Sequence, residues 1–310
     1  MRYHSRLRLG LQRGKFPVYF VQCAGKGVQT HSFSPLDTKN RGMKELLVLF
    51  SCLFFLAFLV PWKLRNWCAI LGWTCIVFFL FAEVPYYLSI NNFMYPVMAV
   101  LSVPFLAITA RHLLTREVLV MQLSTAAAVA FLIYAPFAYT PLGDWLISVV
   151  VGQTAWMLEA FGYPPNQLAW NLLSRNTFRV EIILACTGIQ AIAIMLGVVS
   201  AVKTTMGQKV RSFLLIVPTI YVLNILRNTA VIIAYTEQWF PFLPEIAGNG
   251  EYGYESFFWA HNVFAEGLAL LLLIGIAWGL FRIIPDLADF ATGLVQLYWR
   301  DIRRVSRKDR

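Results

Sequence analysis

Charged residues are scarce in this sequence. Of its 310 residues only 14% are Asp, Glu, Lys or Arg, whereas 58% are hydrophobic. A soluble domain has about a quarter of its residues charged, so the composition excludes that class and predicts an integral membrane protein. The short segments of alternating polarity that mark outer-membrane barrels are also lacking. The sequence therefore predicts an all-α, polytopic membrane protein.

Motifs for metals and nucleotides are lacking as well. The sequence has no Walker loop, no dinucleotide-binding fingerprint and no His-Glu-x-x-His pair. Its five cysteines show no zinc-site spacing, and their odd number argues against a disulfide scaffold. We therefore expect no metal and no cofactor. Cys52, Cys68 and Cys75 are expected to pack as small apolar residues.

Long apolar runs account for most of the chain. Each is about as long as a helix that crosses roughly 30 Å of hydrocarbon. An eighth stretch, 142–163, has no basic loop on either side, and we interpret it as an interfacial or re-entrant helix on the outer face. The predicted architecture is thus about seven transmembrane helices plus this extra helix. The seven runs are 45–62, 66–84, 93–111, 118–139, 183–202, 212–235 and 257–281.

The distribution of charge orients these helices. Basic residues cluster in the loop 203–211 and in the tail 300–310, which the positive-inside rule places in the cytoplasm. The connection 236–256 contains four Glu and neither Lys nor Arg, as suits an external loop. The net charge of +10 follows from such clusters, so we expect no nucleic acid as a partner.

The N-terminal end conflicts with this orientation. Alternation of the helices puts residues 1–42 outside, although they carry many basic residues. One resolution is that Met43 is the true start, and we predict that residues 1–42 are dispensable or untranslated. The chain then divides into a basic extension, 1–42, a transmembrane domain, 43–285, and a basic, amphipathic cytoplasmic tail, 286–310.

Three reactive side chains from separate segments fall at one depth. At about 1.5 Å per residue, Cys186, Arg227 and His261 lie roughly 24–31 Å from the basic residues that mark the inner ends of their helices. All three are therefore expected near the outer edge of the hydrocarbon layer. A thiol, a guanidinium and an imidazole at one level suggest a cysteine enzyme at the membrane surface.

The three residue types suit complementary roles. Cys186 would be the nucleophile, and His261 the general acid and base. Arg227 lies in an apolar run, where a charge costs about 2.5–3.5 kcal/mol, and it could stabilise a thiolate or an oxyanion. Singly, each also has a structural reading: a packed cysteine, an arginine that snorkels to the headgroups, and an interfacial histidine. Their agreement in depth favours the site.

Neighbouring polar residues are candidates for binding substrate. Gln190 lies one turn beyond Cys186 and is expected to face the same side. Asn224 and Asn228 flank Arg227 and could fix its geometry. Arg179, in the external segment, could bind headgroups or substrate.

These residues resemble the archaeosortase/exosortase family over roughly 43–285. The cysteine and the arginine match the family's pattern directly, whereas its third basic position varies, so the role of His261 depends most on this chain's own residues. The approach Asn176-Thr177-Phe178-Arg179 also fits. The matching motifs are Ala185-Cys186-Thr187-Gly188-Ile189-Gln190, Leu223-Asn224-Ile225-Leu226-Arg227-Asn228-Thr229 and Trp259-Ala260-His261-Asn262.

The resemblance implies a membrane cysteine transpeptidase with its active site at the extracytoplasmic face. The implied substrates are surface-protein precursors whose C-terminal sorting signal has a Pro-Gly-Phe motif, a hydrophobic helix and a basic tail. The implied acceptor is a membrane phospholipid. Two alternatives remain open: an intramembrane cysteine protease without lipid transfer, and a transporter or lipid-binding protein that uses Arg227 and has no need of Cys186.

Overall fold

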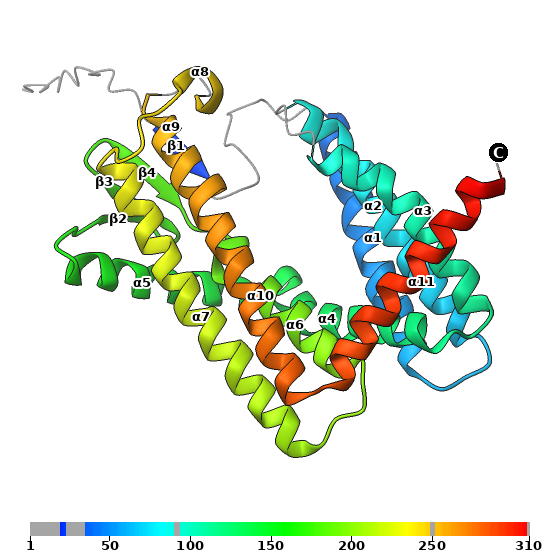
Figure 1. Ribbon diagram of the computed structural model, residues 1–310. Coiled ribbons are helices and arrows are strands. Elements are labelled where there is room, and N and C mark those ends of the chain that lie inside the picture. Colours follow the sequence, from blue (N-terminus) through cyan, green and yellow to red (C-terminus); the bar gives the residue numbers. More distant parts are fainter. Residues whose placement is uncertain (1–18, 23–34, 90–93, 249–251, 309–310) are drawn as a thin grey trace, which may run out of the picture.

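The structure is a computed structural model that describes residues 19–22, 35–89, 94–248 and 252–308. Helices dominate it, which confirms the predicted helical class (Figure 1). The long helices are α1 (Pro35–Leu59), α2 (Arg65–Ser89), α3 (Met94–Leu114), α4 (Val118–Tyr139), α5 (Leu142–Ala160), α6 (Ile189–Ser200), α7 (Met206–Thr236), α10 (Glu266–Ile283) and α11 (Asp286–Lys308). Two short helices are α8 (Pro244–Ala247) and α9 (Tyr254–Phe257).

The multi-pass character is confirmed, but the helix count differs from the predicted seven. Within the part of the chain that the structure describes, five helical spans are long and apolar enough to cross a membrane. They are Arg65–Pro85, Tyr95–Leu114, Val118–Tyr139, Met206–Thr236 and Tyr254–Ile283. The other two predicted runs contain only shorter apolar helices, Leu46–Leu59 and Ile189–Ser200. Helix α5, predicted to be interfacial or re-entrant, is not among the five spans.

Residues 166–181 form three strands of a small sheet, and residues 19–22 form the fourth. Its strands are β1 (Tyr19–Gln22), β2 (Asn166–Ala169), β3 (Leu172–Arg175) and β4 (Phe178–Glu181), in the order β1-β4-β3-β2. β1 pairs with β4 in parallel, and the other pairs are antiparallel. Strands of four residues are too short to give a clear alternating pattern, so the sequence did not predict them.

Two of these elements bear on the predicted domain boundaries. β1 lies within residues 1–42, and α1 begins at Pro35 and continues through Met43. The division at Met43 therefore coincides with no element boundary. Whether translation starts there stays a prediction. An N-terminal peptide from residues 1–42 in the native protein would exclude the untranslated version.

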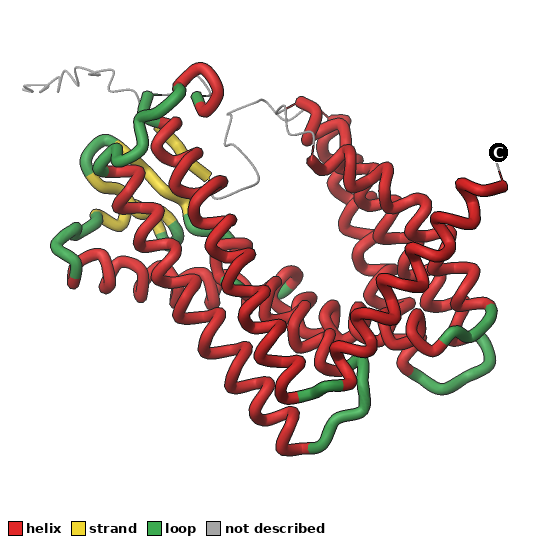
Figure 2. Tube along the Cα trace, in the orientation of Figure 1, coloured by secondary structure: helices red, strands yellow, loops and turns green. Residues whose placement is uncertain are grey.

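The sheet is fixed to the C-terminal end of α7 by side chains of the β3–β4 hairpin. Arg175 forms an ion pair with Glu237, and its guanidinium carbon lies 4.7 Å from the centre of the Tyr163 ring. Asn176 donates a hydrogen bond of 3.2 Å to the carbonyl of Thr236. Figure 2 shows the strands gathered at this one end of the helical pair α7 and α10. The hairpin is thus held where Cys186 follows β4.

The helices form two groups (Figure 1). One contains α5, α7 and α10, the other contains α1, α2 and α3, and α4, α6 and α11 connect them. One hydrophobic cluster contains residues of α5, the sheet and α7. A second joins α4, α6, α7, α10 and α11, and a third joins α1, α2, α3, α4 and α11. Helix α11 contributes Leu287 and Phe290 to the second cluster and Leu297 to the third. This helix therefore connects the two groups by burying residues in both.

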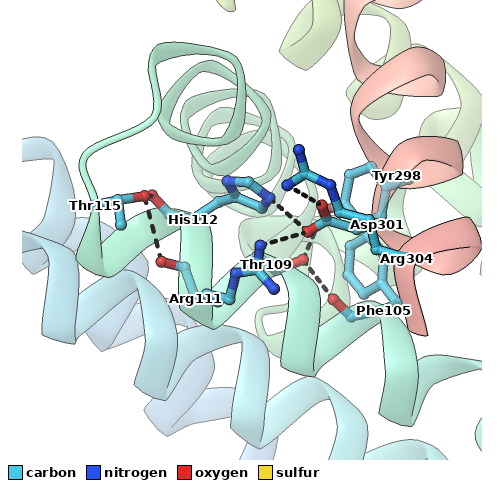
Figure 3. Close-up of polar contacts among 8 residues, drawn as sticks. All are labelled: Phe105, Thr109, Arg111, His112, Thr115, Tyr298, Asp301 and Arg304. Carbon is cyan, nitrogen blue, oxygen red and sulfur yellow. Dashed lines mark hydrogen bonds and ion pairs between the residues drawn. The ribbon is translucent and has the colours of Figure 1, made fainter. Parts of the chain in front are cut away.

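A buried carboxylate fixes α11 to α3 (Figure 3). Asp301 is only 4% exposed, and its Oδ2 lies 2.8 Å from Nε2 of His112 and 3.4 Å from Nη2 of Arg111. One turn earlier, the hydroxyls of Tyr298 and Thr109 are 2.6 Å apart. Because burying an unpaired carboxylate is costly, this pairing specifies the position at which α11 crosses α3.

Candidate active site

Cys186 lies on a tight turn between the sheet and α6. It belongs to the 3-10 helix η1 (Leu184–Thr187), and its side chain is buried, at 2% exposure. The following Gly188 has a φ of 78°, a left-handed conformation that glycine adopts readily. A Cβ at Gly188 would lie 3.3 Å from Cβ of Asn224 on α7. This position therefore needs glycine both for its backbone and for the close approach of α7.

Two asparagines of α7 hold the backbone of Cys186. The side-chain amides of Asn224 and Asn228 both donate to the Cys186 carbonyl, the latter at 2.8 Å. Residues four apart in a helix lie on one face, so both amides reach the same oxygen. From the sequence we expected these asparagines to bind substrate or to fix Arg227. In the structure their amide groups hold the turn that carries Cys186.

The side chain of Asn228 contains a buried polar atom, Oδ1. Its side chain is 4% exposed, and among the residues described here its Oδ1 has no hydrogen-bond partner. Asn228 is also one of the residues around a small, closed gap, or pocket, between β4, α7 and η2. The pocket is lined by Val180, Ile182, Asn228, Val231, Ile232 and His261.

Arg227 and His261 form a direct pair. Nη2 of Arg227 lies 3.1 Å from Nε2 of His261, which is 3% exposed and stacks on Phe257 with ring centres 4.8 Å apart. Nδ1 of His261 lies 2.7 Å from Oδ1 of Asn262. The histidine occupies a π-helix, η2 (Phe258–Ala265), a rare form that is frequent at functional sites.

The pocket joins these parts. Its walls combine Val180 of β4, Asn228 of α7 and His261 of η2. Cys186 belongs to the same hydrophobic cluster as Val180 and as Val231 of the pocket wall. The structure therefore gathers the elements that carry the thiol, the guanidinium and the imidazole around one region.

Two further residues predicted for the site, Gln190 and Arg179, are not among the residues that line the pocket. Nε2 of Gln190 donates to the hydroxyl of Tyr134 on α4 at 3.2 Å. The expectation that Gln190 shares a face with Cys186 assumed one continuous helix, which the left-handed Gly188 interrupts. Arg179 alternates along β4 with the buried Phe178 and Val180, so it lies on the opposite face of that strand.

The contact between Asn262 and His261 was not predicted from the sequence. Asn262 follows His261 directly, and adjacent residues of an α-helix do not face each other. Only the π-helix shows that the two side chains can meet. In the described part of the chain, no group of three or more His, Cys, Asp or Glu residues is placed to hold a metal ion.

Comparison with known sequences identifies the family. Residues 40–251 match the family model described as transmembrane exosortase. The chain belongs to the transmembrane exosortase family. The exosortase match includes Cys186 and Arg227 and ends before His261.

Two characterised relatives of this exosortase carry the name archaeosortase A. The protein from Haloferax volcanii is 28% identical over 241 residues, which cover 70% of this chain and 80% of the relative. The protein from Natronomonas pharaonis is 31% identical over 202 residues, covering 59% of this chain and 64% of the relative. No solved structure matches the chain.

Proposed function

We propose that this exosortase-family protein is a membrane cysteine transpeptidase. It would cleave the C-terminal sorting signal of surface-protein precursors, made of a Pro-Gly-Phe motif, a hydrophobic helix and a basic tail, and transfer the protein to a membrane phospholipid. The observation that carries the proposal is the Arg227–His261 contact on one side and the two asparagines of α7 that hold the Cys186 carbonyl on the other, with Arg227 adjacent to Asn228 in α7. The names of the two relatives support the same activity.

The first half of the reaction would form an acyl-enzyme. The sulfur of Cys186 attacks the scissile carbonyl, and Arg227 stabilises the oxyanion that develops. As the C–N bond breaks, the thiol's proton passes through Nε2 of His261 to the leaving amine. In the resting arrangement Nε2 accepts a hydrogen bond from Arg227. It becomes able to accept a proton when Arg227 turns that donor toward the oxyanion.

The second half would release the product. A phospholipid hydroxyl attacks the thioester carbonyl, and its proton goes to Nε2 of His261 and then to the departing sulfur of Cys186. The C–O bond forms and the C–S bond breaks, so the thiol and the neutral imidazole are restored.

Three polar residues are candidates for binding the substrate: Asn228, Arg179 and Gln190. Oδ1 of Asn228 is a buried acceptor with no partner among the described residues, and we propose that it accepts an N–H from the substrate backbone. Arg179, at the sheet, and Gln190, at the start of α6, remain candidates for more distant contacts. Glu237, the first of the four Glu in the connection 236–256, pairs with Arg175 of the sheet at the C-terminal end of α7. The charge of this connection supports an active site at the extracytoplasmic face.

Two rival functions make different demands. A protease would use the same residues with water as acceptor, so the mass of the product's C-terminus separates it from a transpeptidase. A transporter or lipid-binding protein would need Arg227 but not the thiol. The amides that fix the Cys186 carbonyl favour an enzyme, because a binding protein has no use for a positioned cysteine.

The decisive experiment follows a C-terminally anchored surface protein in cells that carry wild-type enzyme, Cys186→Ala or Cys52→Ala. Gel mobility reports cleavage, and incorporation of a labelled lipid reports transfer. We expect Cys186→Ala to abolish both signals and Cys52→Ala, a half-buried position on α1, to preserve both. Unchanged processing in Cys186→Ala would refute the cysteine mechanism. Cleavage without labelling in the wild type would identify a protease.

A further inference from the structure

The contacts of His261 define where its proton lies. Arginine has only hydrogen-bond donors, so the nitrogen that Arg227 contacts at 3.1 Å, Nε2, must act as an acceptor. A neutral imidazole then carries its proton on Nδ1. That nitrogen lies 2.7 Å from Oδ1 of Asn262, to which it donates. The neutral Nδ1–H tautomer fits both contacts.

The contact with Asn262 lies within the π-helix η2. In an α-helix, consecutive side chains point about 100° apart and do not face each other. His261 and Asn262 are consecutive, and they meet within η2. The ring is then held on three sides, by Phe257 against its face, Arg227 at Nε2 and Asn262 at Nδ1.

We infer that Asn262 is a positioning residue that fixes the tautomer and ring orientation of His261 so that Nε2 is the reactive nitrogen. This inference rests on the proposed function, because it assigns a role within the same site. The chemical logic is that of the third member of a Cys-His-Asn arrangement, which holds the imidazole in the tautomer that the thiol requires. Asn262 itself touches neither thiol nor substrate in this scheme.

The test replaces the amide and then restores an acceptor. Asn262→Leu is close in size but has no acceptor, and we expect its processing rate to fall about tenfold or more, in kcat rather than KM. Asn262→Asp provides an acceptor oxygen again and should recover much of that loss. Val263→Ala, a partly exposed neighbour in η2, is the control for general damage to the helix and should keep nearly wild-type activity.

A second readout does not depend on turnover. The chain has only four histidines, so ¹⁵N NMR of histidine-labelled enzyme can resolve the His261 nitrogens, assigned with His261→Gln. We expect the wild type to show protonated Nδ1 and bare Nε2, and Asn262→Leu to show a mixture of tautomers. A wild-type Nε2–H signal, or unchanged kcat in Asn262→Leu, would overturn the inference.

The two readouts also separate this inference from the proposed function. If Asn262→Leu processes normally while Cys186→Ala is inactive, the inference fails and the transpeptidase stands. If Cys186→Ala processes normally, the proposed function fails, and the role of Asn262 fails with it whatever the tautomer.

Discussion

Replacing Gly188 with alanine tests whether the turn that carries Cys186 depends on close contact with α7. Gly188 has a φ of 78°, and a new Cβ would lie 3.3 Å from Cβ of Asn224 and 3.4 Å from Cγ2 of Ile220. An alanine in the left-handed region costs about 1–2 kcal/mol. Displacing Asn224 would also weaken one of the two hydrogen bonds to the Cys186 carbonyl, which is worth about 0.5–1.5 kcal/mol.

These costs sum to about 1.5–3.5 kcal/mol. As a loss of folding stability, this sum should lower the melting temperature in detergent by several degrees. The part that acts on the position of Cys186 is the weakened hydrogen bond, and since about 1.4 kcal/mol corresponds to a factor of ten in rate, we expect Gly188→Ala to slow processing about two- to tenfold. Both quantities are measured on purified enzyme, the rate with a precursor peptide that contains the sorting signal and the melting temperature by intrinsic tryptophan fluorescence.

Gly152→Ala provides the matched control. Gly152 lies inside α5, and a Cβ there would meet nothing within 4 Å. Alanine in a helix interior is favoured over glycine by about 0.5–1 kcal/mol, so this variant should be at least as stable as the wild type and equally active. A Gly188→Ala enzyme with wild-type rate and melting temperature would refute the argument that close contact with α7 positions the nucleophile.

Two other contacts give predictions. Asp301→Ala removes the carboxylate that His112 and Arg111 share. We expect the free energy of unfolding to fall by about 1–3 kcal/mol, which a lower melting temperature would show. An unchanged melting temperature would contradict the role of Asp301 in fixing α11. Arg175→Met breaks the ion pair with Glu237. This variant should lose less than about 1 kcal/mol of folding stability. It should nevertheless react faster with a thiol reagent at Cys186, because the β3–β4 hairpin is held less firmly. Equal labelling rates in variant and wild type would contradict the role of Arg175 in holding the hairpin.

Composition and helix length were enough to predict a polytopic helical protein. The depth argument placed Arg227 and His261 at one level, and the structure joins them by a hydrogen bond. Their chemical roles stay predictions, as does that of Cys186. What the sequence could not predict depends on local backbone geometry. The helical spacing between Cys186 and Gln190 does not hold, because Gly188 breaks the helix between them.

The sheet and the π-helix escaped prediction for related reasons. Strands of four residues leave too few positions for alternation to be recognised. A π-helix has no compositional signature of its own, and the residues of η2 are as apolar as those of an ordinary transmembrane helix. The pairing of His261 with Asn262 depends on that geometry, so it could be found only from coordinates.

The π-helix also affects how this family should be compared. A π-helical segment accommodates more residues per turn than an α-helix, so a relative with one residue fewer between Phe258 and Ala265 could form an α-helix with the same ends. Downstream of such a deletion, the helix would turn by about 100° per residue. The side chain that aligns with His261 would then not be the one that occupies its place. Equivalent residues in this segment should therefore be assigned by superposing structures. Sequence alignment alone is suited to the motifs around Cys186 and Arg227.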